Sequence, residues 1–171
     1  MRIEAFLRQS PVFQASRIAR RTEASLNAIL QDEGLTFFEA LMLAAIFFEK
    51  KGGIKPSDLA ETFQTTRGNV SHCVSSLEAK GLVRRRIDPD DARSFRLVLQ
   101  PVGKKRAVRV VGIFDRMQTH FEKNVGVTKL AGMLEQMRAV EELCSDLAGL
   151  VVSEDGELGR CPRDAQHESQ A

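Results

Sequence analysis

Apolar positions in the first third of the chain recur at helical spacing between residues that start or stop helices. Ser10-Pro11 combines a capping hydroxyl with a proline suited to the first helical position, and the apolar positions after it extend towards Gly34. Thr36 with Glu39 forms a predicted capping box, and the run from there to Phe48 is apolar on nearly every side. We expect one helix from Pro11 and a second, buried helix after Thr36.

The middle of the chain predicts two short helices followed by two strands. Pro56 begins the first of these helices, and Thr65-Thr66 caps a second one over about residues 67–80. Alternating apolar positions then indicate strands over residues 83–87 and 95–99. The polar segment between the strands is too long for a tight turn, so we expect a protruding hairpin.

The last third of the chain predicts two further helices. Pro101 starts a long helix, the region 124–128 interrupts it, and a last helix follows over about residues 128–150. This helix carries an apolar stripe of Leu130, Leu134, Met137, Val140, Leu143, Leu147 and Leu150. Because the small middle module cannot cover such a stripe, we expect the first and last helices to form an intertwined dimer layer. An intramolecular helical bundle is the alternative.

Composition places the chain among ordinary globular proteins. It has 171 residues, of which 43% are hydrophobic and 28% are charged, enough for one domain with helical extensions. The apolar runs are too short to span a bilayer, and the N-terminus does not match a secretory signal. Three cysteines without a Cys-x-x-Cys pair argue against a disulfide scaffold or a thiolate zinc site. We therefore expect a cytoplasmic protein that makes no membrane contact and holds no metal and no cofactor.

The charge is distributed unevenly. The segment from Lys55 to Arg106 carries a net charge of +5, whereas the rest of the chain carries −3. A basic middle between acidic flanks indicates that one module meets a polyanion. A solvated surface with chance clustering of charge is the alternative.

Two short helices joined by a tight turn and followed by a basic hairpin are typical of a winged helix-turn-helix. A helix about 10–12 Å across fits the major groove, and its first residues face base edges. Thr66 would cap the second short helix, whose free amides and dipole favour phosphate. The candidate DNA-contacting residues here are Thr65, Thr66, Arg67, Gly68, Asn69, Ser71, His72 and Ser75. A merely solvated first turn is the alternative.

The hairpin supplies a second set of candidate residues. Arg84-Arg85-Arg86 can bind phosphate, and Arg93 near the tip can reach an adjacent minor groove, where negative potential concentrates. We expect Asp88 or Asp91 to pair with Arg93 and hold it extended, as a support for the wing.

With these features in place, residues 35 to about 103 resemble the MarR (multiple antibiotic resistance regulator) family of bacterial transcription factors. The wing segment matches the Asp-x-x-Asp-x-Arg pattern of that family, and Gln100-Pro101 departs from the usual Leu-Thr without removing the helix start. The residues that carry the resemblance are Leu59-Ala60, Val70-Ser71, Leu77-Glu78-Ala79-Lys80-Gly81-Leu82-Val83, Asp88-Pro89-Asp90-Asp91-Ala92-Arg93, Leu97-Val98-Leu99 and Gly103.

The resemblance implies a homodimer that places two reading helices and two wings on a palindromic operator in double-stranded DNA. The expected fold is mainly α with a small β-hairpin wing, a winged helix-turn-helix domain flanked by N- and C-terminal dimerisation helices. The corresponding segments are 1–34 for the N-terminal dimerisation helix, 35–103 for the DNA-binding domain, 104–152 for the C-terminal dimerisation helices and 153–171 for a disordered tail.

Proteins of this kind often bind an aromatic or anionic small molecule between the dimer layer and the DNA-binding lobe. The residues that would line such a pocket here are Phe13, Arg17, Phe37, Phe38 and Met42, although an ordinary core position is the alternative for each. Among the cysteines, Cys73 lies in the reading helix and is interpreted as packed rather than reactive. Cys144 is a small apolar filler, and Cys161 lies in the tail near His167. The three histidines share no ligand spacing that predicts a metal site.

Three classes of function compete. A sequence-specific DNA-binding dimer, most simply a repressor, explains the basic middle segment and the flanking helices. A winged-helix module for protein–protein assembly, whose basic wing is only solvated, is the alternative. An enzyme has little support, because the chain has no phosphate-binding glycine loop, no nucleophile elbow and no tyrosine or tryptophan.

Overall fold

The computed structural model describes residues 3–49 and 52–153, with side chains as far as residue 146. Its fold is mainly helical with one small antiparallel hairpin, as the sequence predicts. The elements in chain order are α1 (Ile3–Gln9), α2 (Pro11–Ile29), a 3-10 turn (Gln31–Glu33), α3 (Phe37–Phe48), α4 (Pro56–Thr62), α5 (Arg67–Ala79), β1 (Val83–Asp88), β2 (Asp91–Leu99), α6 (Pro101–Val125) and α7 (Val127–Ser153).

The predicted helix starts are confirmed by local hydrogen bonds and by proline. At α3 both halves of the capping box form: Glu39 N donates to Thr36 Oγ1 at 3.2 Å, and Thr36 N donates to the Glu39 carboxylate at 2.8 Å. At α5 the Thr66 hydroxyl accepts a hydrogen bond from Asn69 N. Pro101 occupies the first turn of α6, where its missing amide costs no helical hydrogen bond.

The N-terminal region differs from the sequence expectation. A short helix, α1, precedes Ser10, and the helix that begins at Pro11 ends at Ile29 rather than continuing towards Gly34. A 3-10 turn follows, and Gly34 closes it with a left-handed backbone (φ 64°). The seven residues of α1 were not predicted because they are too few for a helical period to stand out.

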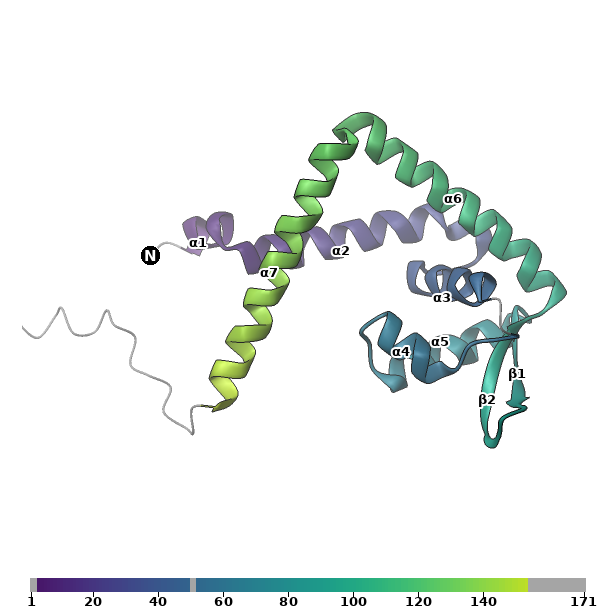
Figure 1. Ribbon diagram of the computed structural model, residues 1–171. Coiled ribbons are helices and arrows are strands. Elements are labelled where there is room, and N and C mark those ends of the chain that lie inside the picture. Colours follow the sequence, from purple (N-terminus) through teal and green to yellow (C-terminus); the bar gives the residue numbers. More distant parts are fainter. Residues whose placement is uncertain (1–2, 50–51, 154–171) are drawn as a thin grey trace, which may run out of the picture. The chain divides into compact units, whose positions relative to one another are not determined.

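The described part of the chain divides into two compact units, one formed by residues 3–14 with 127–153 and the other by residues 15–49 with 52–126. In the second unit α3 is central, and it packs against α5, α6 and β2 (Figure 1). Its largest fully buried side chains come from several elements and include Leu30, Met42, Leu43, Leu59, Val70, Leu77, Leu82, Leu97 and Val110. This core carries the α4–α5 pair and the hairpin.

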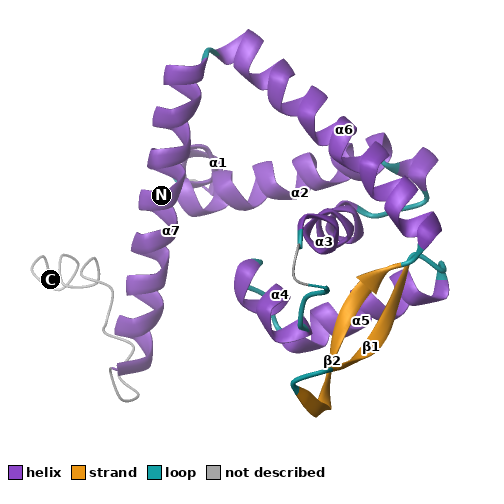
Figure 2. Ribbon diagram, turned by 45° about the vertical axis from the view of Figure 1, so that its right-hand side comes forward, coloured by secondary structure: helices purple, strands orange, loops and turns teal. Residues whose placement is uncertain are grey.

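The hairpin is tighter than the sequence predicts. β1 and β2 pair from Val83 with Leu99 to Ile87 with Phe95, and Asp88 then pairs with Asp91 after a break in register. The expectation of a long loop over residues 88–94 is wrong, because Asp91 and the residues after it continue the second strand. The hairpin extends away from the helices (Figure 2).

Two glycines allow segments to approach the hairpin closely. A Cβ on Gly103 would lie 1.9 Å from the carbonyl oxygen of Leu82, so only glycine lets α6 pass the start of β1. Gly53 has a φ of 119°, and its Cβ would lie 2.7 Å from Leu97 O. The next residue, Ile54, forms an isolated β-bridge with Leu97 through two backbone hydrogen bonds. The sequence pattern did not indicate this pairing.

Candidate nucleic-acid interface

The helix α5 has one buried apolar face and one exposed polar face. Val70, Cys73, Val74 and Leu77 are buried against the core. The exposed positions of the helix and its N-cap are Thr66, Arg67, Gly68, Asn69, Ser71, His72 and Ser75, while Thr65 is half-buried. All of the candidate DNA-contacting residues of this segment therefore lie on or beside the surface that the core leaves open.

The turn that leads into α5 orders its first side chains. Gln64 adopts a left-handed backbone (φ 45°) between α4 and α5. Asn69 is held by its backbone and by its side chain. Its backbone amide donates to Thr66 Oγ1, and its side-chain amide donates to Thr65 Oγ1 at 2.9 Å. These two hydrogen bonds hold the Asn69 amide group in place at the start of the helix.

Gly68 differs from Gly53 and Gly103, which allow close approaches of the backbone. A Cβ there would meet only Thr66 Oγ1, at an ordinary 3.9 Å, so the packing of the described chain does not demand glycine. Its exposed position in the first turn leaves the backbone of α5 accessible to a close partner.

The three consecutive arginines of β1 are not equivalent. The Arg85 guanidinium lies 3.3 Å from the Glu78 carboxylate and stacks 4.9 Å from the ring centre of Phe95. The Arg86 guanidinium donates to Gly52 O at 2.8 Å. Within residues 3–49 and 52–146, Arg84 shows no such contact, so Arg84 is the member of the three that is most available to phosphate.

Asp88 supports the wing, but through different partners from those expected. Its carboxylate is fully buried and lies 2.8 Å from Lys55 Nζ and 3.0 Å from Arg96 Nε. The expected pairing of Asp88 or Asp91 with the Arg93 guanidinium is wrong. Instead, the Arg93 backbone amide donates to Asp91 Oδ1 at 3.0 Å, a bond that shapes the turn and leaves the side chain exposed.

The electrostatics of Asp88 follow from this geometry. The hydrogen bond from Lys55 is the main cause that holds the pKa of Asp88 far below its usual range, and Arg96 and the Asp90 amide act in the same direction against the effect of burial. The carboxylate therefore stays charged and ties the hairpin tip to the segment that precedes α4.

A buried contact between α3 and α5 escaped the sequence analysis. Besides capping α3, the Glu39 carboxylate accepts hydrogen bonds from Ser76 Oγ and from Lys80 Nζ, the latter at 2.6–2.7 Å. Burial alone would raise the pKa of Glu39, but these hydrogen bonds lower it. The clue that the sequence offered was that Glu39 is the only charged residue in the otherwise apolar helix Phe37–Phe48.

Cys73 lies on the buried side of α5, as its interpretation as a packed residue requires. Burial, reinforced by the negative charge of Glu39, raises the pKa of the Cys73 thiol to about 11. At neutral pH this sulfur is a thiol rather than a reactive thiolate.

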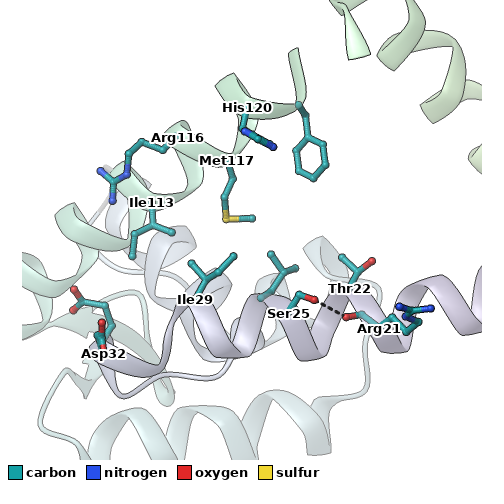
Figure 3. Close-up of a pocket in the computed structure, with 12 residues that line it drawn as sticks. Arg21, Thr22, Ser25, Ile29, Asp32, Ile113, Arg116, Met117 and His120 are labelled. Carbon is teal, nitrogen blue, oxygen red and sulfur yellow. Dashed lines mark hydrogen bonds between the residues drawn. The ribbon is translucent and has the colours of Figure 1, made fainter. Parts of the chain in front are cut away.

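A cavity of about 760 Å³ opens between α2 and α6 (Figure 3). Ile113 and Met117 point from α6 towards Ile29 and its neighbours on α2, while Arg116 and His120 lie along the upper rim. Its other lining residues are Arg21, Thr22, Ser25, Leu26, Asp32, Glu33 and Phe121.

None of the five residues expected to line an effector pocket lines this cavity. Met42 is fully buried in the core. Phe37 and Phe38 are half-buried and make edge-to-face contacts with Phe114 and Phe63. Phe13 is half-buried and Arg17 is exposed on α2. The expectation placed aromatic residues of α3 at a pocket, whereas α3 directs them into packing against α6 and the turn after α4.

The described part of α7 exposes much of its predicted apolar stripe. Leu134, Met137 and Leu143 are exposed to 45%, 60% and 64%. Leu130 and Val140 are half-buried. The side chains of Leu147 and Leu150, the predicted disordered tail, Cys161 and His167 lie outside the described residues.

The described residues show neither a membrane-spanning helix nor a metal-binding cluster. None of their helices is long and apolar enough to cross a membrane. No group of three histidine, cysteine or acidic side chains in residues 3–49 and 52–146 is arranged to hold a metal ion.

Solved structures similar to this one share its arrangement of elements. The structure of an MepR–DNA complex from S. aureus matches 82% of this chain and 98% of its own, with a TM-score of 0.66 and 23% identity. The structure of CouR from Rhodococcus jostii RHA1, bound to p-coumaroyl-CoA, matches 78% of this chain and 93% of its own, with a TM-score of 0.65 and 20% identity. At these identities the likeness establishes the winged helix-turn-helix fold.

Two comparisons of sequence point the same way. The HTH-type transcriptional regulator BilQ of Clostridioides difficile (strain CD3) is 20% identical over 98 residues, which are 57% of this chain and 66%, slightly less than two thirds, of the relative. Such relatives are transcriptional regulators rather than enzymes. The MarR family model matches residues 49–95, which hold α4, α5, β1 and the first half of β2. Over residues 49–95 the chain is thus similar to the MarR family, and its fold is that of the structural relatives described above.

Proposed function

We propose that the protein is a transcriptional regulator that binds double-stranded DNA in a sequence-specific manner. The observation that carries the proposal is that α5 and the hairpin, parts of one compact unit, both present polar and basic side chains away from the core. The first turn of α5, with Arg67 and Asn69, enters the major groove and reads base edges. Arg84 and Arg93 on the hairpin bind the flanking backbone and minor groove.

The regulator acts as a homodimer on a palindromic operator. The exposed apolar side chains of Leu134, Met137 and Leu143 on α7 support this assembly, because water-exposed stripes of this kind mark protein interfaces. A two-fold pair of reading helices requires a DNA site with matching half-sites. We infer repression as the output, since a dimer that covers its operator blocks access of other proteins to that DNA.

A small molecule controls release of the DNA. The cavity between α2 and α6 supports this part of the proposal, because its apolar walls of Ile29, Ile113 and Met117 meet cationic or titratable groups at Arg116 and His120. Such a lining suits an aromatic or anionic effector. The structural relative CouR contains p-coumaroyl-CoA, an aromatic acyl thioester with an anionic tail. We therefore propose this cavity as the effector site, in place of the pocket residues expected from the sequence.

The decisive experiment is selection of preferred duplexes from a randomised pool, followed by a salt titration of the selected duplex. We expect one palindromic motif, with log K falling against log salt by about 0.9 for each phosphate contacted. A protein–protein module would select no motif and would show a weak salt dependence, and that result would refute the proposal. Fluorescence anisotropy with a labelled duplex measures both quantities.

A further inference from the structure

The Glu39 carboxylate joins the start of α3 to the last turns of α5. Its side chain is only 7% exposed, and both oxygens are used: Ser76 Oγ and Lys80 Nζ donate from α5, and Thr36 N donates from the cap of α3. Lys80, at 34% exposure, closes the contact from the solvent side. We call this set, Glu39 with Ser76 and Lys80, the α3–α5 strut.

The strut adds a directional constraint to the apolar contact between α3 and α5. The other contacts of α5 with the core are made by apolar side chains such as Val70, Val74 and Leu77. Apolar contacts depend on area and allow a helix to slide or rotate slightly at little cost, whereas hydrogen bonds weaken steeply when distance and angle change. Three charge-assisted bonds to one carboxylate therefore set the rotation of α5 about its axis.

The other end of the strut is itself held firmly. α3 packs against α6, and Phe37 in its first turn lies edge-to-face against Phe114 with ring centres 6.1 Å apart. Asn27 Oδ1 accepts a hydrogen bond from the Phe37 amide at 2.6 Å, which ties the same turn to α2. The first turn of α3 is thus fixed to both long helices of its unit, and Glu39 projects from that turn to α5.

Rotation of α5 decides which of its exposed side chains face a bound duplex. Successive residues of a helix are separated by about 100°, so a rotation of a fraction of that angle moves Arg67 and Asn69 away from hydrogen-bonding geometry with a base edge. Contacts to phosphate tolerate such a shift better, because the charge attraction is less directional and wing arginines contribute independently.

We propose that Glu39 is a positioning residue for DNA readout, which sets the rotation of α5 through Ser76 and Lys80 and so controls discrimination between DNA sequences. This inference rests on the proposed function. In this inference, a buried carboxylate that does not touch DNA contributes to sequence specificity. The exposed cations contribute the non-specific affinity.

The test compares affinity for the selected duplex with affinity for a shuffled duplex of the same composition. Lys80→Met keeps the aliphatic stem and removes the ammonium group, and Glu39→Gln keeps an acceptor for the Thr36 amide while removing the charge. We expect either change to lower the ratio of the two affinities by roughly threefold to thirtyfold, with the shuffled duplex bound nearly as before. The double variant is expected to show no larger decrease than the single variants, because both break the same interaction.

Arg109→Met is the matched control. Arg109 makes a similar two-atom contact, at 2.8 and 2.9 Å, with the carboxylate of Glu33, and this pair lies at α6 and the 3-10 turn rather than at α5. Its removal is expected to leave the affinity ratio at the wild-type value. Lys80→Arg retains a cationic donor. Its affinity ratio is therefore expected to be much closer to the wild-type value than that of Lys80→Met.

The outcomes separate the inference from the function on which it rests. If the wild-type chain selects no motif, the proposed function fails and the inference with it. If the wild-type chain selects a motif but Lys80→Met keeps the wild-type affinity ratio, the positioning role of Glu39 is refuted and the proposed function stands. The same conclusion follows if Lys80→Met lowers the affinities for both duplexes equally, as a loss of folded protein would. Should Glu39→Gln or Lys80→Met fail to fold, Ser76→Ala removes one bond of the strut with little change in volume and is judged by the same ratio.

Discussion

The carboxylate of Asp88, at the end of β1, lies 2.8 Å from the ammonium group of Lys55, in the segment immediately before α4. The same carboxylate lies 3.0 Å from Arg96 on β2. One buried anion thus connects the hairpin tip, the second strand and the start of the helix-turn-helix. The wing is thereby fixed to the module that carries α5.

Replacing Asp88 with asparagine is expected to lower stability at neutral pH, because two cations lose their shared counter-charge. The folded pKa of Asp88 is lowered below its unfolded value near 4, so its contribution is full above about pH 5 and is lost as pH falls towards the folded pKa. The difference in urea midpoint between wild type and Asp88→Asn should therefore shrink between about pH 5 and pH 3. A difference that is constant over this range would contradict the assigned role.

Replacing Gly103 with alanine is expected to destabilise the fold by about 1–3 kcal/mol or more. The added Cβ would lie 1.9 Å from Leu82 O, a backbone atom that can move only if α6 and β1 separate. Gly112→Ala in the same helix is the control, since its Cβ would meet only the end of the Arg116 side chain at 3.6 Å. Chemical denaturation measures both, and equal midpoints for the two variants would show that the close approach is not required.

Replacing Arg93 with alanine is expected to weaken binding to the selected operator and to A·T-rich duplexes alike. Its guanidinium is exposed near the hairpin tip, so the variant would lack one cation that reaches the groove or a phosphate. The salt slope should fall by about one phosphate equivalent. Gel shift or anisotropy measures the effect, with Arg138→Ala on α7 as the control, and unchanged affinity in Arg93→Ala would remove the hairpin from the interface.

Replacing Arg67 or Asn69 is expected to change which bases are preferred. Removal of a bidentate pair of hydrogen bonds to a base costs about 1–3 kcal/mol of discrimination at the base pair that it reads. Selection from a randomised pool measures the altered preference. If either variant recovers the wild-type motif, the exposed face of α5 has been assigned the wrong role.

Cys73 is expected to resist alkylation in the folded protein. With a pKa of about 11, roughly one Cys73 thiol in a thousand is ionised at pH 8, and the sulfur is also buried. Peptide mapping after brief treatment with iodoacetamide should show labelling of the half-buried Cys144 before Cys73, with full labelling of both in denaturant. Equal labelling of the two in the native state would contradict the buried thiol.

Local sequence was sufficient to predict most element boundaries. Thr36, Thr66 and Pro101 start helices through interactions with backbone groups a few residues away, so the information lies within one turn of the chain. The exposed face of α5 was likewise predictable, because the apolar spacing of Val70, Val74 and Leu77 leaves only one polar side.

Partners distant in sequence were decided only by the tertiary structure. The sequence showed Asp88 and Arg93 close together and suggested that they pair, but the folded hairpin places Asp88 against Lys55 and Arg96 instead. Glu39 was predicted as a cap, yet its further partners Ser76 and Lys80 lie on another helix. Which charges meet depends on how helices and strands pack, and no local pattern specifies that packing.

By itself, then, the sequence determined where the helices from Pro11 onward begin, where the first strand lies and which face of α5 is polar, because hydrogen-bonded caps and apolar periodicity act over a few residues. The tertiary structure decided which arginines remain available on the hairpin, where the cavity between α2 and α6 opens, and what holds α5 in place. These depend on distances between segments far apart in the chain, which are set by burial of a shared core.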